Sequence, residues 1–248
     1  MTALGNGLFI AGTDKGVGKT LVASVLAPAV HRRIGNGGDA KIMLWKPVQI
    51  GVTGPSPHSD SARLVFGSGL PLEPPDTFTY AFPEPVLPWM AAQREGARIS
   101  FAQLVEDGLE RLRTNDFTFV EGVGGLAVPL TDRHLMSDLA GALDLPLLIV
   151  ARPGIGTVNH TLLTVSFARQ AGLRPVGILF NGYREAQQQL MEENAIVIER
   201  FTGVPVVGRL PWMPGSPVTP KEWDLWRERW LAIVESQVEF ERFLPVGA

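Results

Sequence analysis

Short, continuous apolar runs alternate along this chain with longer stretches whose apolar residues recur every three or four positions. The runs are LFIA, IMLW, FTFV, PLLIVA, VGILFN and PVVG, and unbroken apolar runs are typical of strands that helices cover on both faces. The stretches between them predict helices over 19–33, 101–113, 157–171 and roughly 186–201. Because strands and helices alternate, we predict a doubly wound α/β fold, a mostly parallel sheet between two helical layers.

The end of the chain, about 219–243, predicts one more helix. Thr219 and Glu222 have the spacing of a capping box around Pro220. An apolar stripe follows at helical spacing, formed by Trp226, Trp230, Ile233, Val234 and Val238. We expect this helix to pack on the core of its own chain, and the alternative is an aromatic face that binds a partner.

Length and composition bound the possible functions. With 248 residues, 45% hydrophobic and 19% charged, and with no linker or repeat, we expect one domain spanning 1–248. A formal net charge of -3 gives no basic footprint for nucleic acid or for an anionic membrane surface. The chain has no cysteine, and its first apolar stretch, 8–11, is too short to direct secretion or span a membrane, so we expect a cytoplasmic protein.

The unusual sequences of this chain follow the predicted strands. The first four runs, LFIA, IMLW, FTFV and PLLIVA, are followed in turn by GTDKGVGKT, KPVQIG, EGVGG and RPGIGTVNH. The carboxyl ends of parallel strands meet at one edge of a sheet, where open α/β sheets bind ligands. The proline-rich segment 53–89 has no clear period and predicts a long excursion over this edge, with a short helix near Asp60.

GTDKGVGKT, residues 12–20, is a phosphate-binding P-loop in its predicted context, between a strand and a helix. Gly18 and the helix N-terminus supply backbone N–H groups, Lys19 reaches the β and γ phosphates, and Thr20 offers a hydroxyl to Mg²⁺. Lys15 can also reach phosphate. The loop departs from the common pattern because five residues separate Gly12 from Gly18.

A metal that serves phosphate chemistry needs hard oxygen ligands near this loop. Glu121 ends the run FTFV, directly before Gly122 and Gly124, where backbone N–H groups can approach an anion. Asp60, in HSDSA, is the second candidate. The alternatives are an ordinary carboxylate at a strand end for Glu121 and a helix N-cap for Asp60.

Other candidates lie at the same predicted edge. Lys46 follows the second run and precedes Pro47, which we expect to end the strand. Lys46 would place a second cation on the transferring phosphoryl group. The alternative is a solvated surface lysine. Residues 156–159 open a predicted helix, either as a site for a carboxylate or as a plain capped start. Asn181 can donate to and accept from a base edge. The histidines show no ligand spacing: His31, His58, His134 and His160.

GTDKGVGKT, WKPVQIG, HSDSA, VEGVGG, GIGTVNHTLLT and RLPW occur in the order and spacing that resemble dethiobiotin synthetase. The resemblance covers all but about the last thirty residues. It implies a homodimer that uses ATP and Mg²⁺ to join 7,8-diaminononanoate to CO₂, through a carbamate and a carbamic-phosphoric anhydride, and closes the ring of dethiobiotin. It implies Thr20, Asp60 and Glu121 as metal ligands, and Lys46, Lys19 and Lys15 as catalytic residues.

The resemblance also implies two binding sets. The ATP set is Asp14, Lys15, Gly16, Val17, Gly18, Lys19, Thr20, Asp60, Glu121, Gly122, Gly124, Asn181, Pro211 and Trp212. The substrate set is Lys46, Ile50, Gly124, Gly156, Thr157, Val158 and Asn159. In this family the helix N-terminus at 156–159 meets the distal carboxylate of the substrate across the dimer interface.

Three positions depart from the family. Ile50 stands where many members carry serine or threonine, so a hydrogen bond to the reacting group is lost. Trp89, in LPW, stands where histidine is frequent, and Gly16 stands where some members have an acidic residue. These changes leave the phosphate and metal parts intact and bear on the substrate contacts.

Two other functions use similar motifs. A related P-loop amide ligase, such as a cobyrinic acid diamide synthase, usually adds a glutamine-hydrolysing domain, for which this chain is too short and lacks a cysteine nucleophile. A partition-type or septum-site switch ATPase has the loop KGGxGKT, whereas Asp14 stands here at the position of the first lysine. No basic amphipathic tail that would bind a membrane is evident.

Overall fold

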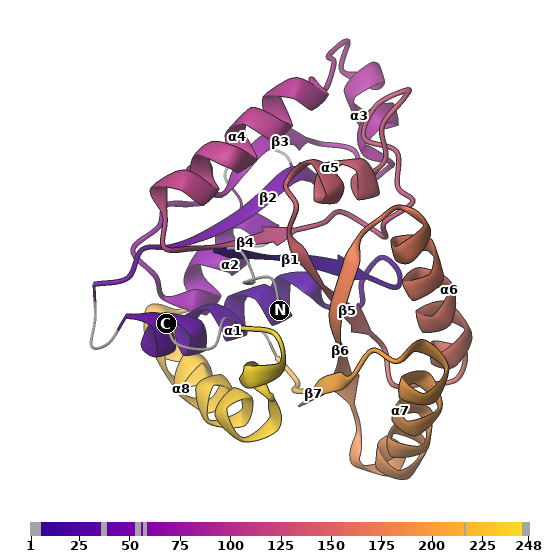
Figure 1. The fold of residues 1–248 in the computed structure, drawn as a ribbon. Coiled ribbons are helices and arrows are strands. Elements are labelled where there is room, and N and C mark those ends of the chain that lie inside the picture. The colour runs from indigo at the N-terminus through magenta and orange to yellow at the C-terminus, as the bar shows by residue number, and fades with distance from the viewer. Residues whose placement is uncertain (1–5, 36–38, 53–55, 57–58, 216, 245–248) are drawn as a thin grey trace.

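A computed structural model of the protein describes residues 6–35, 39–52, 56, 59–215 and 217–244. They form a seven-stranded sheet in the order β3-β2-β4-β1-β5-β6-β7, in which all neighbouring strands run parallel (Figure 1). The strands are β1 (Gly7–Gly12), β2 (Ile42–Ile50), β3 (Phe78–Phe82), β4 (Phe117–Glu121), β5 (Pro146–Ala151), β6 (Arg174–Tyr183) and β7 (Val206–Pro211). The predicted doubly wound α/β fold is confirmed.

Helices cover both faces of the sheet (Figure 1). They are α1 (Lys19–Ile34), α2 (Asp60–Ser68), α3 (Pro88–Arg94), α4 (Phe101–Thr114), α5 (Met136–Ala142), α6 (Thr157–Gln170), α7 (Gln188–Thr202) and α8 (Pro220–Gln237), with the 3₁₀ turns η1 (Pro74–Thr77), η2 (Glu185–Gln187) and η3 (Phe240–Arg242). Because strand side chains alternate, Leu8 and Ile10 join the core that packs on α1, α2 and α8, whereas Phe9 and Ala11 join the core under α3 to α7.

The order of the strands reverses direction around β1, which lies between β4 and β5. From β1 the chain first winds through α1 to β2 and β3 on one side, and later through β5, β6 and β7 on the other. In open α/β sheets, loops that leave the carboxyl ends of strands on either side of such a reversal separate and leave a crevice. The loop between β1 and α1 therefore opens onto that crevice.

Two expectations about the strands are wrong. The proline-rich segment contains β3, which pairs with β2 as an edge strand, and β2 does not end at Lys46 but continues through Pro47 to Ile50. Pairing of β2 with β4 is registered only up to Trp45, beyond which β2 pairs with β3. A proline is tolerated at position 47 because β2 has a paired neighbour on only one side there. The missing N–H of the proline therefore does not interrupt hydrogen bonding on both sides of the strand.

The helix ends follow their capping residues. The Ser59 side chain accepts from the Ala62 N–H at 3.1 Å, so Ser59 is the N-cap of α2 and the alternative that Asp60 serves only as a cap is wrong. The capping box of Thr219 and Glu222 at the start of α8 is confirmed. Within the expected range 219–243, α8 ends at Gln237, and η3 follows it.

The remaining sequence expectations about helices mostly hold. The helix expected at about 186–201 begins with η2 and continues as α7. His58, with residues 53–55 at the start of the expected excursion, lies outside the described residues. None of the described helices has the length and apolar character needed to cross a membrane.

Candidate functional site

The loop between β1 and α1 depends on glycine at three positions. Gly16 and Gly18 have φ angles of 72° and 97°, a left-handed conformation that other residues adopt at a cost. A Cβ at Gly12 would lie 2.7 Å from Lys19 Nζ, and one at Gly18 would collide with the side-chain amide of Asn181. α1 then begins without a side-chain cap, so the backbone N–H groups of its first turn are open to an anion.

Backbone groups of this loop hold three charged side chains, those of Lys19, Asp14 and Arg152. Lys19 Nζ donates to the Asp14 carbonyl at 3.1 Å, and the Lys15 N–H donates to Asp14 Oδ1 at 2.6 Å. Arg152, directly after β5, donates to the Lys15 carbonyl at 2.9 Å. Burial lowers the pKa of Lys19 to about 8, although the nearby Glu121 opposes this effect. An anion bound beside the buried ammonium would stabilise its charged form.

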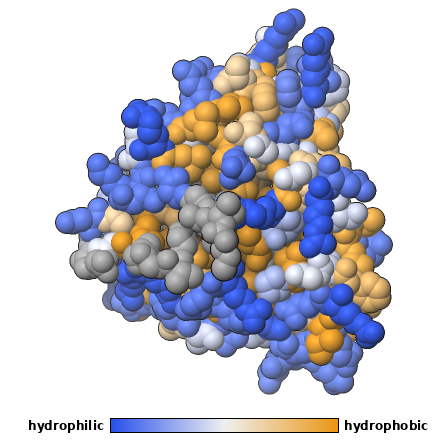
Figure 2. Space-filling model, in the orientation of Figure 1, coloured by the Kyte–Doolittle hydropathy of each residue, from blue (hydrophilic) through white to orange (hydrophobic). Residues whose placement is uncertain are grey.

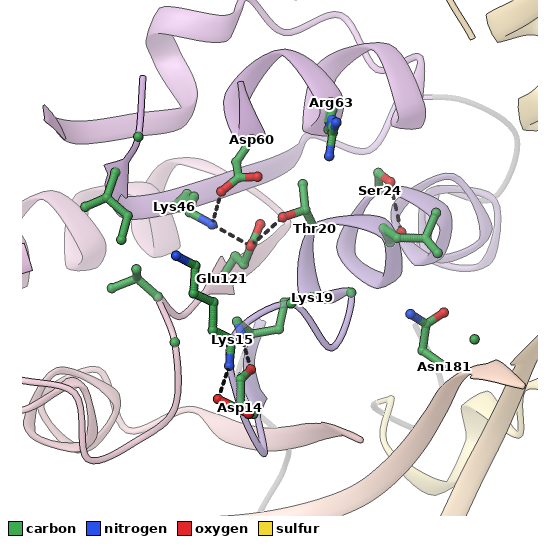
Figure 3. A pocket seen from close by; sticks show the side chains of 18 of the residues that line it. Asp14, Lys15, Lys19, Thr20, Ser24, Lys46, Asp60, Arg63, Glu121 and Asn181 are labelled. Carbon is green, nitrogen blue, oxygen red and sulfur yellow. Dashed lines mark hydrogen bonds and ion pairs between the residues drawn. The ribbon is translucent and has the colours of Figure 1, made fainter. Parts of the chain in front are cut away.

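A buried charge centre lies beside the loop (Figure 3). Lys46 Nζ is 2.7 Å from Glu121 Oε1 and 2.6 Å from Asp60 Oδ2. The Thr20 hydroxyl donates to the same Glu121 oxygen at 2.7 Å. Lys46 and Glu121 are 4% and 1% exposed, so the alternative that Lys46 is a solvated surface lysine is wrong.

The pKa shifts in this centre follow from burial and pairing. Burial would lower the pKa of Lys46, but Glu121 and Asp60 outweigh it and raise that pKa. Burial would raise the pKa of Asp60, but the Lys46 ammonium overcomes this and lowers it. Glu121 is fully enclosed, and burial raises its pKa despite Lys46. Lys46 is therefore held charged, in a position to act on a negative group that enters the site.

The oxygens of this centre suit Mg²⁺. Thr20, Asp60 and Glu121 supply a hydroxyl and two carboxylates, and Glu121 Oε2 is buried with no hydrogen-bond partner in the described part of the chain. Mg²⁺ is usually held by one or two carboxylates together with substrate phosphates and water. No group of three or more His, Cys, Asp or Glu side chains suited to a metal occurs within the described residues. Phosphate oxygens would therefore have to complete the coordination.

A second set of residues lies on the far side of the loop, where β6 and β7 end. Asn181 Nδ2 donates to the Val17 carbonyl at 2.9 Å, while its Oδ1 is buried without a partner in the described residues. One of the two amide N–H groups of Asn181 is thus engaged by the loop, and its oxygen is left without a partner that a base could supply. Trp212 is half exposed, and the Arg184 guanidinium lies 4.3 Å from the centre of its ring.

One cavity of about 1090 Å³ joins these features. Its lining includes most of the residues expected from the sequence: Asp14, Lys15, Gly16, Gly18, Lys19, Thr20, Lys46, Ile50, Asp60, Glu121, Gly124, Asn181, Pro211 and Trp212. In the orientation of Figure 1, Figure 2 shows apolar surface interspersed with strongly polar surface on the face turned toward the viewer. A volume of this size exceeds what most single small ligands require.

Some expected residues lie outside the cavity lining. Val17 is buried in the core under the loop, and Gly122 packs closely on Phe9 and the Ile10 carbonyl. Residues 156–159 open α6, with Gly156 as a left-handed N-cap, but none of them lines this cavity. Trp89 also does not line it, whereas its neighbours Pro88 and Met90 do.

Sequence reasoning missed one wall of the cavity. Arg63 and Ser24 line it, together with Trp223, Trp226 and Trp230 of α8. Arg63 could have been found because it lies three residues after Asp60 on the same helix face. The α8 residues gave no such signal, because their stripe has the spacing of any packing helix.

Comparison with known proteins assigns the family. The model of the AAA domain family matches residues 6–217. The chain is 42% identical over 217 residues to an ATP-dependent dethiobiotin synthetase BioD of Bacillus thuringiensis, covering 88% of this chain and 87% of that protein. It is 41% identical over 211 residues to the protein of the same name from Bacillus anthracis, covering 85% of each. This chain belongs to the ATP-dependent dethiobiotin synthetase family.

Solved structures show that the fold of this synthetase family member is shared more widely. A ParA family ATPase from Chlorobium tepidum TLS superimposes with a TM-score of 0.51 at 13% identity, covering 93% of this chain and 92% of that one. The MinC:MinD cell division protein complex of Aquifex aeolicus gives 0.50 at 13% identity, covering 93% and 88%. At this identity the likeness shows the fold alone, so the assignment rests on the synthetases.

Proposed function

We propose that this protein is an ATP- and Mg²⁺-dependent ligase that carboxylates 7,8-diaminononanoate with CO₂ and closes the ring of dethiobiotin. Membership of the dethiobiotin synthetase family supports the reaction. The observation that carries the site assignment is the position of Lys46 Nζ, 2.7 Å from Glu121 and beside the P-loop. A fixed cation there faces the place where a phosphoryl group would be transferred.

The chemistry begins with a carbamate, formed when one amine of the substrate adds to CO₂. A carbamate oxygen attacks the γ-phosphorus of ATP, the bond to the β-phosphate oxygen breaks, and ADP leaves. The second amine then attacks the carbamoyl carbon and expels phosphate. Both amines belong to one molecule, so the last step is intramolecular and positioning contributes much of its rate.

The residues have separate roles in these steps. Lys19 and the first turn of α1 hold the β and γ phosphates, with Lys15 assisting from the loop. Thr20, Asp60 and Glu121 would hold Mg²⁺, which when bound neutralises charge on the phosphates. Lys46 stabilises the charge that develops on the transferring group. These assignments account for a cation and a carboxylate that are both almost fully buried.

The ends of the two substrates extend in opposite directions from this centre. We place the adenine between Asn181, Pro211 and Trp212, with Asn181 Oδ1 accepting from its amino group. We place the diamine beside Ile50 and Gly124 on the other side of Lys46. Ile50 adds apolar contact there and offers no hydrogen bond, which suits a hydrocarbon chain.

The proposed site for the distal carboxylate of the substrate requires a second copy of the chain. The N-terminus of α6, residues 156–159, does not line the cavity of its own chain. We propose that it serves the site of a second copy in a homodimer, each copy being one domain. Sedimentation that showed only monomer at the concentrations used for assays would contradict this sharing.

The direct test incubates purified protein with 7,8-diaminononanoate, bicarbonate, ATP and Mg²⁺ and detects dethiobiotin by mass spectrometry. We expect product from the wild type and none above background from Lys19→Ala. Lys221→Ala, an exposed lysine on α8, is the matched control and should retain activity. ATP hydrolysis without dethiobiotin would reject the substrate assignment and leave the nucleotide site standing.

A further inference from the structure

One part of the cavity lining has no role in the proposed chemistry. It lies between α1, α2 and α8, and it includes Ser24, Arg63, Trp223, Trp226 and Trp230. These elements all pack on one face of the sheet, whereas the substrate side, near α3, belongs to the other face. α8 begins at Pro220, beyond residue 217, where the match to the AAA domain family ends.

Arg63 is a cation without a close partner in this part of the cavity lining. Arg33 on the same face is paired with Glu235 at 2.8 Å, whereas the exposed Arg63 guanidinium has no hydrogen bond or close ion pair among the described residues and acts on Asp60 only at longer range, where its charge helps to lower the Asp60 pKa. Figure 3 shows its side chain extending from α2 toward the first two turns of α1, in the direction of Thr20 and Ser24. Those turns follow the loop on which the phosphates are placed. A guanidinium there is positioned to bind a phosphate oxygen.

The tryptophans of α8 form an aromatic wall opposite α1. Trp223, Trp226 and Trp230 contact one another in sequence, with ring centres 5.3 and 5.8 Å apart. Trp230 is 2% exposed, and its Nε1 has no hydrogen-bond partner in the described part of the chain. Trp223 and Trp226 are only half buried. The rings of Trp223 and Trp226 therefore keep apolar surface that is open to the cavity.

The wall is held in place by contacts between helices. Arg227 donates to the Phe66 carbonyl of α2 at 2.7 Å. A Cβ at Gly67 would lie 2.9 Å from Ser24 and 3.4 Å from Trp226, so α2, α1 and α8 approach closely where the wall meets them. The position of the rings is thus fixed relative to the start of α1.

We propose that Arg63 binds the α-phosphate of the nucleotide and that Trp223 and Trp226 pack against its ribose, which makes α8 part of the nucleotide site. This rests on the proposed function, in which Lys19 and Thr20 take the terminal phosphates and Asn181 takes the base. The α-phosphate and the sugar lie between those groups in the nucleotide. A cation next to an aromatic wall matches that anionic and then carbon-rich section.

The test compares Arg63→Gln with Arg63→Lys and with Arg229→Gln, an exposed arginine of α8 outside the cavity. Calorimetry with ATP and Mg²⁺ should give a Kd about tenfold higher for Arg63→Gln, the size expected when a charge-assisted hydrogen bond is lost. Arg63→Lys should recover part of the loss because it keeps the charge. Arg229→Gln should bind as the wild type does.

A second measurement tests the wall independently. ADP binding should change the intrinsic tryptophan fluorescence of the wild type, and Trp223→Phe and Trp226→Phe should each remove part of that change while keeping an aromatic ring. In steady-state assays the KM for ATP should rise in Arg63→Gln, with the KM for diaminononanoate unchanged. This division separates nucleotide contact from a general loss of structure.

Three outcomes would overturn the inference. One is an ATP Kd of Arg63→Gln equal to that of Arg229→Gln. Another is a rise confined to the KM for diaminononanoate, which would place Arg63 with the amine substrate. The third is a nucleotide-dependent fluorescence change that survives intact in both phenylalanine variants. If the wild type binds ATP but makes no dethiobiotin, the proposed function fails while the Kd comparison still decides the role of Arg63.

Discussion

Replacing Lys46 with methionine tests the charge centre directly. The substitution keeps an unbranched side chain and removes the ammonium that lies between Glu121 and Asp60. Breaking a buried pair by removing one partner costs about 3–5 kcal/mol because the other charge stays buried. Glu121 is 1% exposed, but the Asp60 side chain is 34% exposed and can be solvated. We therefore expect a loss of about 3 kcal/mol, at the low end of that range.

The stability assay is urea unfolding, with thermal unfolding as a second probe. For a chain of this size, about 3 kcal/mol corresponds to a fall in Tm of about 6–12 °C. Lys46→Met/Glu121→Gln should regain part of the loss, because a neutral amide replaces the unpaired carboxylate. Lys41→Met, an exposed lysine just before β2, should unfold as the wild type does.

The same variant should lose catalysis for a separate reason. Without the ammonium, charge on the transferring phosphoryl group has no fixed cation on that side, and we expect turnover to fall at least about a hundredfold. Addition of Mg²⁺ in excess should not restore it. If Lys46→Met unfolded at the wild-type urea concentration, the ion pair would contribute nothing net and the reasoning from burial would be refuted.

Three further predictions follow from the same geometry. Gly18→Ala should lose nucleotide binding in calorimetry and about 1–2 kcal/mol of stability, because its φ of 97° is left-handed and its Cβ meets Asn181; unchanged ADP affinity would contradict this. Thr20→Val should raise the Mg²⁺ concentration needed for half-maximal activity while ATP affinity in the absence of metal changes little, and an unaltered Mg²⁺ titration would exclude the hydroxyl as a ligand. The hydrogen bond from Arg33 lowers the pKa of Glu235, so the stabilisation by Glu235 should be complete above the ordinary pKa of 4.5 and be lost as the pH falls below it. The difference in unfolding free energy between wild type and Glu235→Gln, measured in urea at pH 7, should therefore vanish at strongly acidic pH. A difference that grew on acidification would contradict this sign.

The sequence was most informative where function depends on neighbours along the chain. The P-loop is contiguous, and its glycines, lysine and threonine follow from backbone geometry that is local to a strand, a turn and a helix start. The same is true of the capping box at Thr219 and Glu222. Continuous apolar runs also located six of the seven strands, because burial on both faces of a parallel sheet leaves that pattern whatever the topology.

The missed elements depend on contacts between distant segments. β3, with the sequence FTYAF, is short and follows a proline-rich stretch, and it is a strand because the edge of β2 is there to pair with it. The continuation of β2 past Pro47 has the same origin. Because β2 continues beyond Lys46, that residue lies inside the sheet and not at its end. The burial of the Lys46 ammonium therefore could not be predicted from the dipeptide Lys46-Pro47 alone.

The sequence by itself thus determined the fold class, the phosphate loop and the residue types of the charge centre, because each is written in local pattern or spacing. Only the tertiary structure decided that Lys46 Nζ lies between Glu121 and Asp60, that residues 156–159 are outside the cavity, and that Arg63 faces α1 beside the tryptophans of α8. Those facts depend on how helices and strands far apart in the chain pack on a shared sheet. Packing of that kind is set by the whole core and leaves no periodic signal at the residues that it brings together.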